Sequence, residues 1–299
     1  MQYDAIVVGG SYAGMAAGLQ LARARRRVLV IDAGQRRNRF AKASHGFLGQ
    51  DGKPPELIAS EARAQLLAYP TVHWRDATVE DAQGSINAFR VAAGGASHQG
   101  RRLILATGVV DELPEVPGLR ERWGRSVFMC PYCDGYELKQ GRIGVLAADA
   151  RSFHHAMLLP DWGDTILFTN GAYDPSADEL AALARRGVSI ERDAVTAVTG
   201  DAATVVLANG RSFPLNGLFV IPRVHIASPL ATQLGCTIED AALGPIIATD
   251  SLKATSVPGV YACGDTARAM ASVTFAVADG AMAGVATHQS LIFDPAQPH

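Results

Sequence analysis

The first 32 residues combine an apolar run, a glycine-rich turn and an alanine-rich segment in an order that few folds accommodate. Residues 3–8 have the character of a buried parallel strand, residues 9–14 (Gly-Gly-Ser-Tyr-Ala-Gly) form the turn, and residues 15–25 have the pattern of an amphipathic helix. A second apolar run, residues 28–31, ends in Asp32. A strand, a helix and a second strand joined by this turn predict a βαβ unit of the dinucleotide-binding type.

The positions of the turn have separate physical roles in such a unit. We expect Gly9 to allow the tight turn and Gly14 to let the helix pack closely on the strand. The free N–H groups of the helix N-terminus would face a pyrophosphate, and Asp32 is placed to accept hydrogen bonds from a ribose. Ser11 stands where the fingerprint has its middle glycine. We expect its neighbour Gly10 to supply the lost flexibility, so that the site is adjusted rather than lost.

Composition limits the classes of function open to the chain. Its 299 residues suffice for two domains, and 48% hydrophobic residues with 30 glycines suit an α/β protein with many tight turns. A formal net charge of −2 gives no electrostatic basis for binding nucleic acid or an anionic membrane. The basic run from Arg23 to Arg27 is expected to be a solvated helix C-terminus. No apolar run reaches the ~20 residues that cross a bilayer.

Two of the four cysteines, Cys130 and Cys133, form a Cys-x-x-Cys pair that is followed directly by Asp134. Two thiols at this spacing can close into a small disulfide and reopen, so the pair can store two electrons. One alternative is half of a zinc site, which needs four ligands, but Cys236 and Cys263 stand alone in the sequence. The other alternative is a pair of inert thiols. The pattern favours redox chemistry, and we expect no metal site.

The cysteine count also bears on the compartment. Four cysteines in a chain of 299 residues do not make a disulfide scaffold, and the sequence begins with an expected strand rather than a signal peptide. We therefore expect a cytoplasmic protein.

Two further segments extend the first nucleotide site. Residues 103–108 form an expected buried strand that ends in Ala-Thr-Gly, and residues 257–265 form another that ends in Gly264 and Asp265. Together with the N-terminal fingerprint and the cysteine pair, they resemble the two-dinucleotide-fold flavoprotein disulfide reductases. The resemblance implies FAD as the cofactor, with Asp265 on its ribityl chain. The cofactor-binding residues implied are Gly9, Ser11, Ala13, Gly14, Asp32, Ala33, Asn38, Arg39, His45, Thr78, Val79, Ala106, Thr107, Gly108, Gly264, Asp265 and Ala271.

The resemblance to the low-molecular-weight thioredoxin reductases covers the whole chain. It is carried most specifically by residues 130–137, Cys-Pro-Tyr-Cys-Asp-Gly-Tyr-Glu. It implies an α/β protein with two dinucleotide-binding-type domains of the FAD-dependent pyridine nucleotide-disulfide oxidoreductase fold. The FAD-binding domain would be discontinuous, residues 1–115 plus 225–299. Residues 116–224 would form a degenerate NAD(P)-type domain that carries the cysteine pair. The resemblance also implies a homodimer.

The second domain departs from the family pattern. Where the family has Gly-x-Gly-x-x-Ala, residues 147–152 read Ala-Ala-Asp-Ala-Arg-Ser. Side chains here would block close approach of a phosphate to the backbone, and Asp149 would repel it. Residues 169–175 lack the basic cluster that holds the 2′-phosphate of NADPH in the family. We therefore expect no functional NADPH site, the alternative being an ordinary NADPH-dependent reductase with a divergent site.

A branch of the family resembles this combination of an intact cysteine pair with no working pyridine-nucleotide site. Some of its members take electrons from ferredoxin or another non-NADPH donor and reduce thioredoxin, whereas others are oxygen-dependent oxidases that form disulfides in small dithiols. Asp134 is typical of the reductases, since the oxidases have histidine there. We expect a thioredoxin-like protein, or a small dithiol or disulfide, as the partner. A flavin-binding sensor without turnover is a third alternative, which the intact pair disfavours.

The resemblance also assigns roles at the cysteine pair and the C-terminus. Cys133 would face the flavin, Cys130 would exchange with the substrate, and Asp134 would carry a proton unless it only caps a helix. The C-terminal residues 291–299 are expected to be ordered near a flavin, that of the partner subunit, with Phe293 and His299 stacked on it; a frayed terminus is the alternative. The donor, the substrate and the direction of electron flow stay open at this level.

Overall fold

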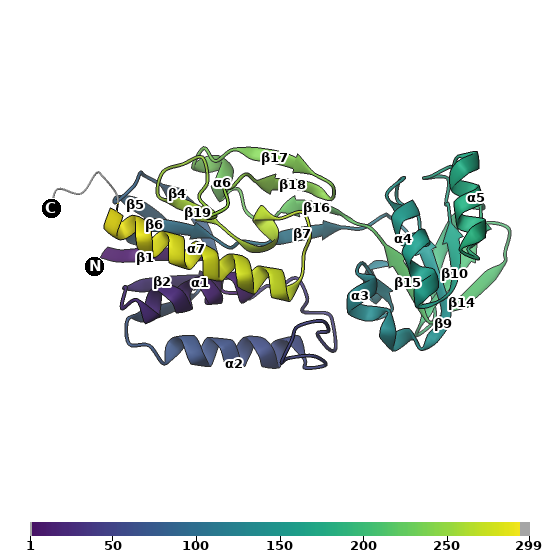
Figure 1. Cartoon of the computed structure of the whole chain (residues 1–299), viewed down its shortest axis with the longest axis horizontal. Coiled ribbons are helices and arrows are strands. Elements are labelled where there is room, and N and C mark those ends of the chain that lie inside the picture. Colours follow the sequence, from purple (N-terminus) through teal and green to yellow (C-terminus); the bar gives the residue numbers. More distant parts are fainter. Residues whose placement is uncertain (1, 294–299) are drawn as a thin grey trace. The chain divides into compact units, whose positions relative to one another are not determined.

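The computed structural model describes residues 2–293 and divides the chain into two compact units (Figure 1). The first unit comprises residues up to Arg39, Pro55–Val110 and the chain from Val224 onward. The second comprises Phe40–Pro54 and Asp111–Arg223. The chain passes from the first unit to the second after Val110 and returns after Arg223. These positions lie close to the expected boundaries at residues 115 and 225. The segment Phe40–Pro54 differs, because we expected it in the first domain and its contacts are with the second unit.

The first unit is built on a mixed sheet with the strand order β3-β2-β1-β6-β5-β4, in which β19 also pairs with β6. The strands β1, β2, β3, β6 and β19 run parallel, whereas β5 is antiparallel to both β4 and β6. The strands are β1 (Gln2–Val8), β2 (Val28–Asp32), β3 (Val72–Asp76), β4 (Val79–Gln83), β5 (Phe89–Ala93), β6 (Ala96–Leu105) and β19 (Val260–Ala262). There are also two sheets of two strands each. In one, β7 (Val109–Glu112) pairs with β16 (Arg223–Ile226), and in the other, β17 (Ile238–Ala241) pairs with β18 (Gly244–Ile247).

The long C-terminal helix of the first unit runs along its N-terminal helix (Figure 1). A side chain at Gly280 would place its Cβ 2.0 Å from the carbonyl oxygen of Ala13, and one at Gly284 would lie 2.5 Å from that of Ala17. Glycine is therefore needed at both positions for the two backbones to approach so closely. The helices are α1 (Tyr12–Arg23), α2 (Pro55–Leu67), α6 (Leu230–Gln233) and α7 (Val273–Phe293), with the 3-10 turn η4 (Gly264–Ala267).

The second unit contains a parallel sheet with the order β11-β10-β9-β15-β8 and an antiparallel sheet β12-β13-β14. Its strands are β8 (Val127–Phe128), β9 (Gln140–Leu146), β10 (Gly163–Phe168), β11 (Ser189–Glu191), β12 (Val195–Thr199), β13 (Ala203–Leu207), β14 (Ser212–Leu215) and β15 (Gly217–Val220). Its helices are α3 (Pro131–Asp134), α4 (Ser152–Leu158) and α5 (Ala177–Arg185), with the 3-10 turns η1 (Arg120–Arg122), η2 (Tyr136–Leu138) and η3 (Leu159–Asp161).

Alternation along the strands explains why the parallel sheet of the second unit is covered on both faces. On β9, Ile143 and Val145 belong to one buried cluster and Leu146 to another. Because successive side chains of a strand point to opposite faces, these residues pack on both sides of the sheet. Helix α5 begins with a capping box, in which the Ser176 and Glu179 side chains bond to each other's backbone N–H groups. The two nucleotide-type folds expected from the sequence are therefore present.

The C-terminal end of the chain is described only in part. Helix α7 extends to Phe293, whose side chain is 76% exposed, and Leu291 is buried. Residues 294–299 lie outside the described residues, so the expected stacking of His299 on a flavin stays a prediction. Among the residues that the structure describes, no helix is both long and apolar enough to span a bilayer.

Candidate functional site

The glycine-rich turn between β1 and α1 is shaped by backbone contacts. Gly9 has a φ of +99°, and a Cβ there would lie 2.2 Å from the carbonyl oxygen of Ala106. A Cβ on Gly14 would lie 1.8 Å from the carbonyl oxygen of Gly9. Both glycines are therefore required, the first by conformation and space and the second by space alone. The turn lies at the carboxyl ends of parallel strands, where this fold binds nucleotides.

The next two residues of the turn, Gly10 and Ser11, differ in what they contribute. Ser11 is the N-cap of α1 with an extended backbone, φ −82° and ψ −165°, which any residue can adopt. The N–H of Gly10 donates to Asp32 Oδ1 at 2.9 Å, and a Cβ on Gly10 would lie 2.3 Å from the Trp74 indole. Glycine is therefore required at position 10 because a side chain would not fit. We expected Gly10 to supply conformational flexibility, but its φ is not positive, so it does not need the freedom that only glycine has.

A second turn, around Gly264, packs against the start of α1, although the two segments are far apart in the sequence. Gly264 has a φ of +75°, and its missing Cβ would lie 2.8 Å from the Cβ of Ala13. Asp265 forms an ion pair with Arg37 at 2.9 Å. The Thr107 hydroxyl bonds to that of Thr266 at 3.4 Å, so the Ala-Thr-Gly turn joins the same group. The structure therefore brings together three segments that the sequence separates widely. Arg37 was missed, although it lies in the basic run before Asn38.

Asn38 gives a direct test of whether a ligand fits beside this turn. Its amide nitrogen donates to the Tyr12 hydroxyl at 3.2 Å, but its Oδ1 is buried and has no hydrogen-bond partner among the described residues. A buried acceptor without a donor costs free energy, which a donor from a bound molecule would recover. With the N–H groups at the α1 N-terminus and the carboxylate of Asp32, the residues fit a dinucleotide such as FAD.

The remaining candidates of the first unit lie on loops or strand ends. Ala33 and Arg39 are exposed, and Arg39 Nη1 donates to the Arg36 carbonyl oxygen at 2.7 Å. Val79 begins β4 and Thr78 precedes it, next to Ala77, whose N–H donates to the Asp32 carbonyl oxygen at 2.9 Å. The other candidate cofactor-binding residues are Ala106, which is buried directly after β6, Gly108, with a φ of +69°, and Ala271, which lies between η4 and α7.

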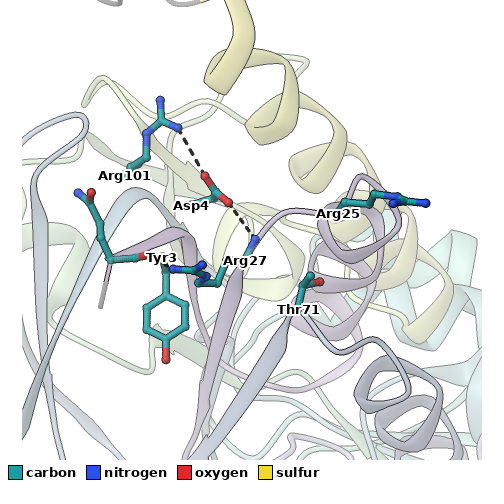
Figure 2. Close-up of a pocket in the computed structure, with 7 residues that line it drawn as sticks. Tyr3, Asp4, Arg25, Arg27, Thr71 and Arg101 are labelled. Carbon is teal, nitrogen blue, oxygen red and sulfur yellow. Dashed lines mark hydrogen bonds and ion pairs between the residues drawn. The ribbon is translucent and has the colours of Figure 1, made fainter.

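A hollow of about 330 Å³ lies elsewhere on the first unit, at the opposite end of β1 (Figure 2). Its lining includes Arg25, Arg27 and Arg101. Asp4 forms an ion pair with Arg101 at 3.4 Å and accepts a hydrogen bond from the Arg27 backbone N–H at 2.9 Å. The hollow is at the amino ends of the parallel strands, away from the glycine turn. We therefore do not assign it to the nucleotide site.

The cysteine pair lies at the start of α3 in the second unit. Cys130 is the N-cap of this helix, and Pro131 occupies its first turn, where proline is favoured because its missing N–H leaves no hydrogen bond unmade. Both cysteines are free thiols, and Cys133 Sγ donates to Cys130 Sγ at 2.7 Å. This hydrogen bond, followed by donation from the Cys133 and Tyr132 backbone, lowers the pKa of the Cys130 thiol, although burial and Asp134 act against it. The surroundings of Cys130 therefore favour its thiolate form.

Asp134 has the properties of a proton donor. It lies at the C-terminal end of α3, so it does not cap the helix N-terminus. Burial raises its pKa to about 7, and the negative charge of Glu137 adds to this effect, whereas the positive charge of His45 opposes it. Such a carboxyl group holds its proton near neutral pH and can give it to a leaving thiolate.

His45 lies beside the segment that carries the cysteine pair. It belongs to the segment Phe40–Pro54 of the second unit. Its Nε2 lies 3.5 Å from Glu137 Oε1. The sequence expectation of a cofactor contact through His45 is therefore untested, and its described contacts are with residues around Asp134. This location depends on long-range packing that spacing in the sequence does not reveal.

The other two cysteines have the environment of inert thiols. Both are buried, and burial raises the pKa of Cys236 and raises that of Cys263 to about 12. Within residues 2–293, no group of three or more histidine, cysteine or carboxylate side chains could hold a metal ion.

The turn between β9 and α4 replaces the second nucleotide turn of the family pattern. Ala147 is fully buried, and the turn contains no glycine. Asp149 is held by Arg151, whose Nη2 lies 2.6 Å from Asp149 Oδ2 and whose Nε donates at 2.9 Å to Oδ1. This ion pair lowers the pKa of Asp149 and offsets its charge. Repulsion of phosphate by Asp149 is thus weaker than expected, so the expected loss of the phosphate site depends mainly on the missing glycines.

Comparisons with known proteins agree with this architecture. Residues 3–280 match the pyridine nucleotide-disulphide oxidoreductase family model. The chain is 54% identical to an oxidoreductase from Agrobacterium tumefaciens whose crystal structure it matches with a TM-score of 0.96, over 98% of this chain and 100% of the other. It is 36% identical to HlmI, with a TM-score of 0.90 over 97% and 93% of the two chains. It is 30% identical to "thioredoxin reductase sirT" of Leptosphaeria maculans, over 94% of this chain and 92% of that protein.

The matches span both units and include the glycine turn and the cysteine pair described above. The chain therefore belongs to the pyridine nucleotide-disulphide oxidoreductase family and is a thioredoxin reductase-like flavoprotein oxidoreductase.

Proposed function

We propose that the protein exchanges electrons between FAD, the Cys130–Cys133 pair and a dithiol or disulfide substrate, without a functional NADPH site. The observation that carries this proposal is the pair itself, with its sulfurs 2.7 Å apart beside a carboxyl group whose pKa is about 7. The glycine-free turn after β9 supports a donor other than NADPH, such as ferredoxin. FAD, when bound by the residues around Gly9, Asn38 and Asp265, would supply a two-electron carrier.

The residues of the pair can reduce a disulfide in two balanced steps. The Cys130 thiolate attacks one substrate sulfur, the substrate S–S bond breaks, and the leaving thiolate takes the proton of Asp134. Cys133 then attacks the Cys130 sulfur, and the second substrate thiolate leaves and takes the Cys133 proton. The substrate gains two electrons and two protons, and the pair becomes a disulfide. The reverse sequence oxidises a dithiol.

The substrate and setting form part of the proposal. A thioredoxin-like protein is the preferred partner, because relatives across most of the chain's length are named thioredoxin reductases. Four free cysteines fit a reducing compartment such as the cytoplasm. A homodimer is proposed from the family resemblance. The exposed apolar side chains of α7, including Met282 and Val285, offer a surface for it.

Adding a small dithiol to the FAD-loaded protein in air tests the direction of electron flow. For a reductase we expect oxygen uptake no faster than that of free FAD with the same dithiol. We also expect the anaerobic protein, supplied with reduced ferredoxin, to reduce oxidised thioredoxin. Rapid oxygen uptake that depends on Cys130 would instead identify a dithiol oxidase.

A further inference from the structure

The loop that carries His45 is closed by its own backbone. The Ser44 N–H donates to the Lys53 carbonyl oxygen at 2.8 Å, and the Gly52 N–H returns a bond to the Ser44 carbonyl oxygen at 2.9 Å. The Asp51 carboxylate accepts the Gly46 N–H at 2.8 Å. These bonds fix the residues on both sides of His45. The imidazole is therefore placed by a closed loop rather than by a free surface segment.

The imidazole of His45 lies between two carboxylates. Its Nδ1 is 3.6 Å from Asp51 Oδ1, and its Nε2 is 3.5 Å from Glu137 Oε1. A neutral imidazole has a proton on only one nitrogen, so it could present a donor to only one of these acceptors. A doubly protonated ring could donate to both carboxylates. The His45 side chain is only 22% exposed, which limits the screening of its electrostatic interactions by water.

The helical segment opposite His45 aligns the groups of the redox site. Cys130 and Asp134 are four residues apart, and the Asp134 N–H donates to the Cys130 carbonyl oxygen at 3.3 Å. Glu137 follows three residues later on η2. Cys130 caps α3, Asp134 ends it, and η2 begins directly after Gly135. The titratable groups therefore follow one another from the thiols through Asp134 and Glu137 to His45.

We propose that His45 is a positioning residue of the redox site: held between Asp51 and Glu137, its positive charge sets the pH at which Asp134 exchanges a proton with the cysteine pair. The use of this proton in disulfide exchange rests on the proposed function. The electrostatic coupling between His45 and Asp134 does not. The charged and titratable groups that face Asp134 are Cys130 and Cys133 on its own element, Glu137 on η2 and His45 on the loop, with Asp51 behind His45.

The electrostatic contributions to Asp134 have opposite signs. Glu137 raises the pKa of Asp134 because a second negative charge disfavours ionisation, and His45 lowers it because a positive charge favours ionisation. Removing the charge of His45 should therefore raise this pKa, and removing that of Glu137 should lower it. A purely structural role for either side chain does not predict opposite shifts.

A carboxyl-carbon NMR titration of the full-length, FAD-loaded protein with 13C-labelled aspartate tests the proposal. The Asp134 signal is assigned by its loss in Asp134→Asn. We expect His45→Gln to raise the midpoint by about 0.5–1 pH unit and Glu137→Gln to lower it by a similar amount. His45→Lys, which keeps a positive charge, should restore a midpoint below that of His45→Gln. Asp164→Asn, an exposed carboxylate of the same unit, should leave it unchanged.

The pH dependence of disulfide exchange gives a second readout. Exchange that uses the Asp134 proton declines as pH rises through its pKa, so the midpoint of that decline should move in the same directions. Midpoints that stay fixed, or that move the same way in His45→Gln and Glu137→Gln, would overturn the inference while leaving the redox role of the cysteines intact. Absence of exchange in the unaltered protein would instead remove the proposed function, and the titration would still report the coupling.

Discussion

Replacing either cysteine of the pair with serine is expected to lower the rate of disulfide exchange on the order of a thousandfold or more, because a serine hydroxyl cannot form the disulfide. The two variants should differ in what they trap. Cys133→Ser keeps the Cys130 thiol, the proposed attacking group, and lacks the thiol that would resolve the product, so it should form a mixed disulfide that it cannot release. Cys130→Ser should form little or none.

Mass spectrometry after incubation with oxidised thioredoxin or a small disulfide separates these outcomes. Cys236→Ser is the matched control, because Cys236 is buried beside Thr255 and has a raised pKa, and it should exchange at the original rate. A mixed disulfide that accumulates in Cys130→Ser and not in Cys133→Ser would show that the two roles are reversed.

Gly14→Ala is expected to abolish retention of FAD and to destabilise the first unit by about 3 kcal/mol or more. Its Cβ would lie 1.8 Å from the carbonyl oxygen of Gly9, so α1 and the turn must move apart. Both groups that would hold the pyrophosphate, the turn and the helix N-terminus, are displaced by that movement.

Gly18→Ala is the control within the same helix. Its Cβ would meet Leu66 at 3.4 Å, an ordinary contact, and alanine favours the helix over glycine by up to about 1 kcal/mol. This variant should keep FAD and unfold at the same temperature or higher. FAD content from the visible spectrum and thermal unfolding measure both effects. Full FAD retention in Gly14→Ala would contradict the description of the turn.

The features that local patterns determine could be predicted from the sequence. The βαβ unit follows from an apolar strand, a glycine turn and an amphipathic helix within residues 3–32, and all three elements are present. The helix that begins after Cys130 follows from Pro131 at its first position. In both places the residues that specify the structure are neighbours in sequence.

Features that depend on distant contacts were not predictable in the same way. The pairing of Arg37 with Asp265 joins residues far apart in the chain, and spacing gives no signal for it. The contact of His45 with Glu137 in the redox segment gave no signal in the sequence, and the expected contact of His45 with the cofactor stays a prediction. Asp149 was expected to repel phosphate, but Arg151 offsets its charge two residues away. Charge counted along a sequence does not say which charges are paired.

The claim that the protein receives its electrons from a donor other than NADPH is tested most directly by anaerobic stopped-flow spectroscopy of the FAD-loaded protein. We predict that micromolar NADPH leaves the flavin absorbance unchanged over minutes, because the turn after β9 offers no glycine cradle for a pyrophosphate. A small dithiol should bleach the flavin in the same experiment through Cys130 and Cys133. Bleaching by NADPH within a second would contradict the account and identify an ordinary NADPH-dependent thioredoxin reductase.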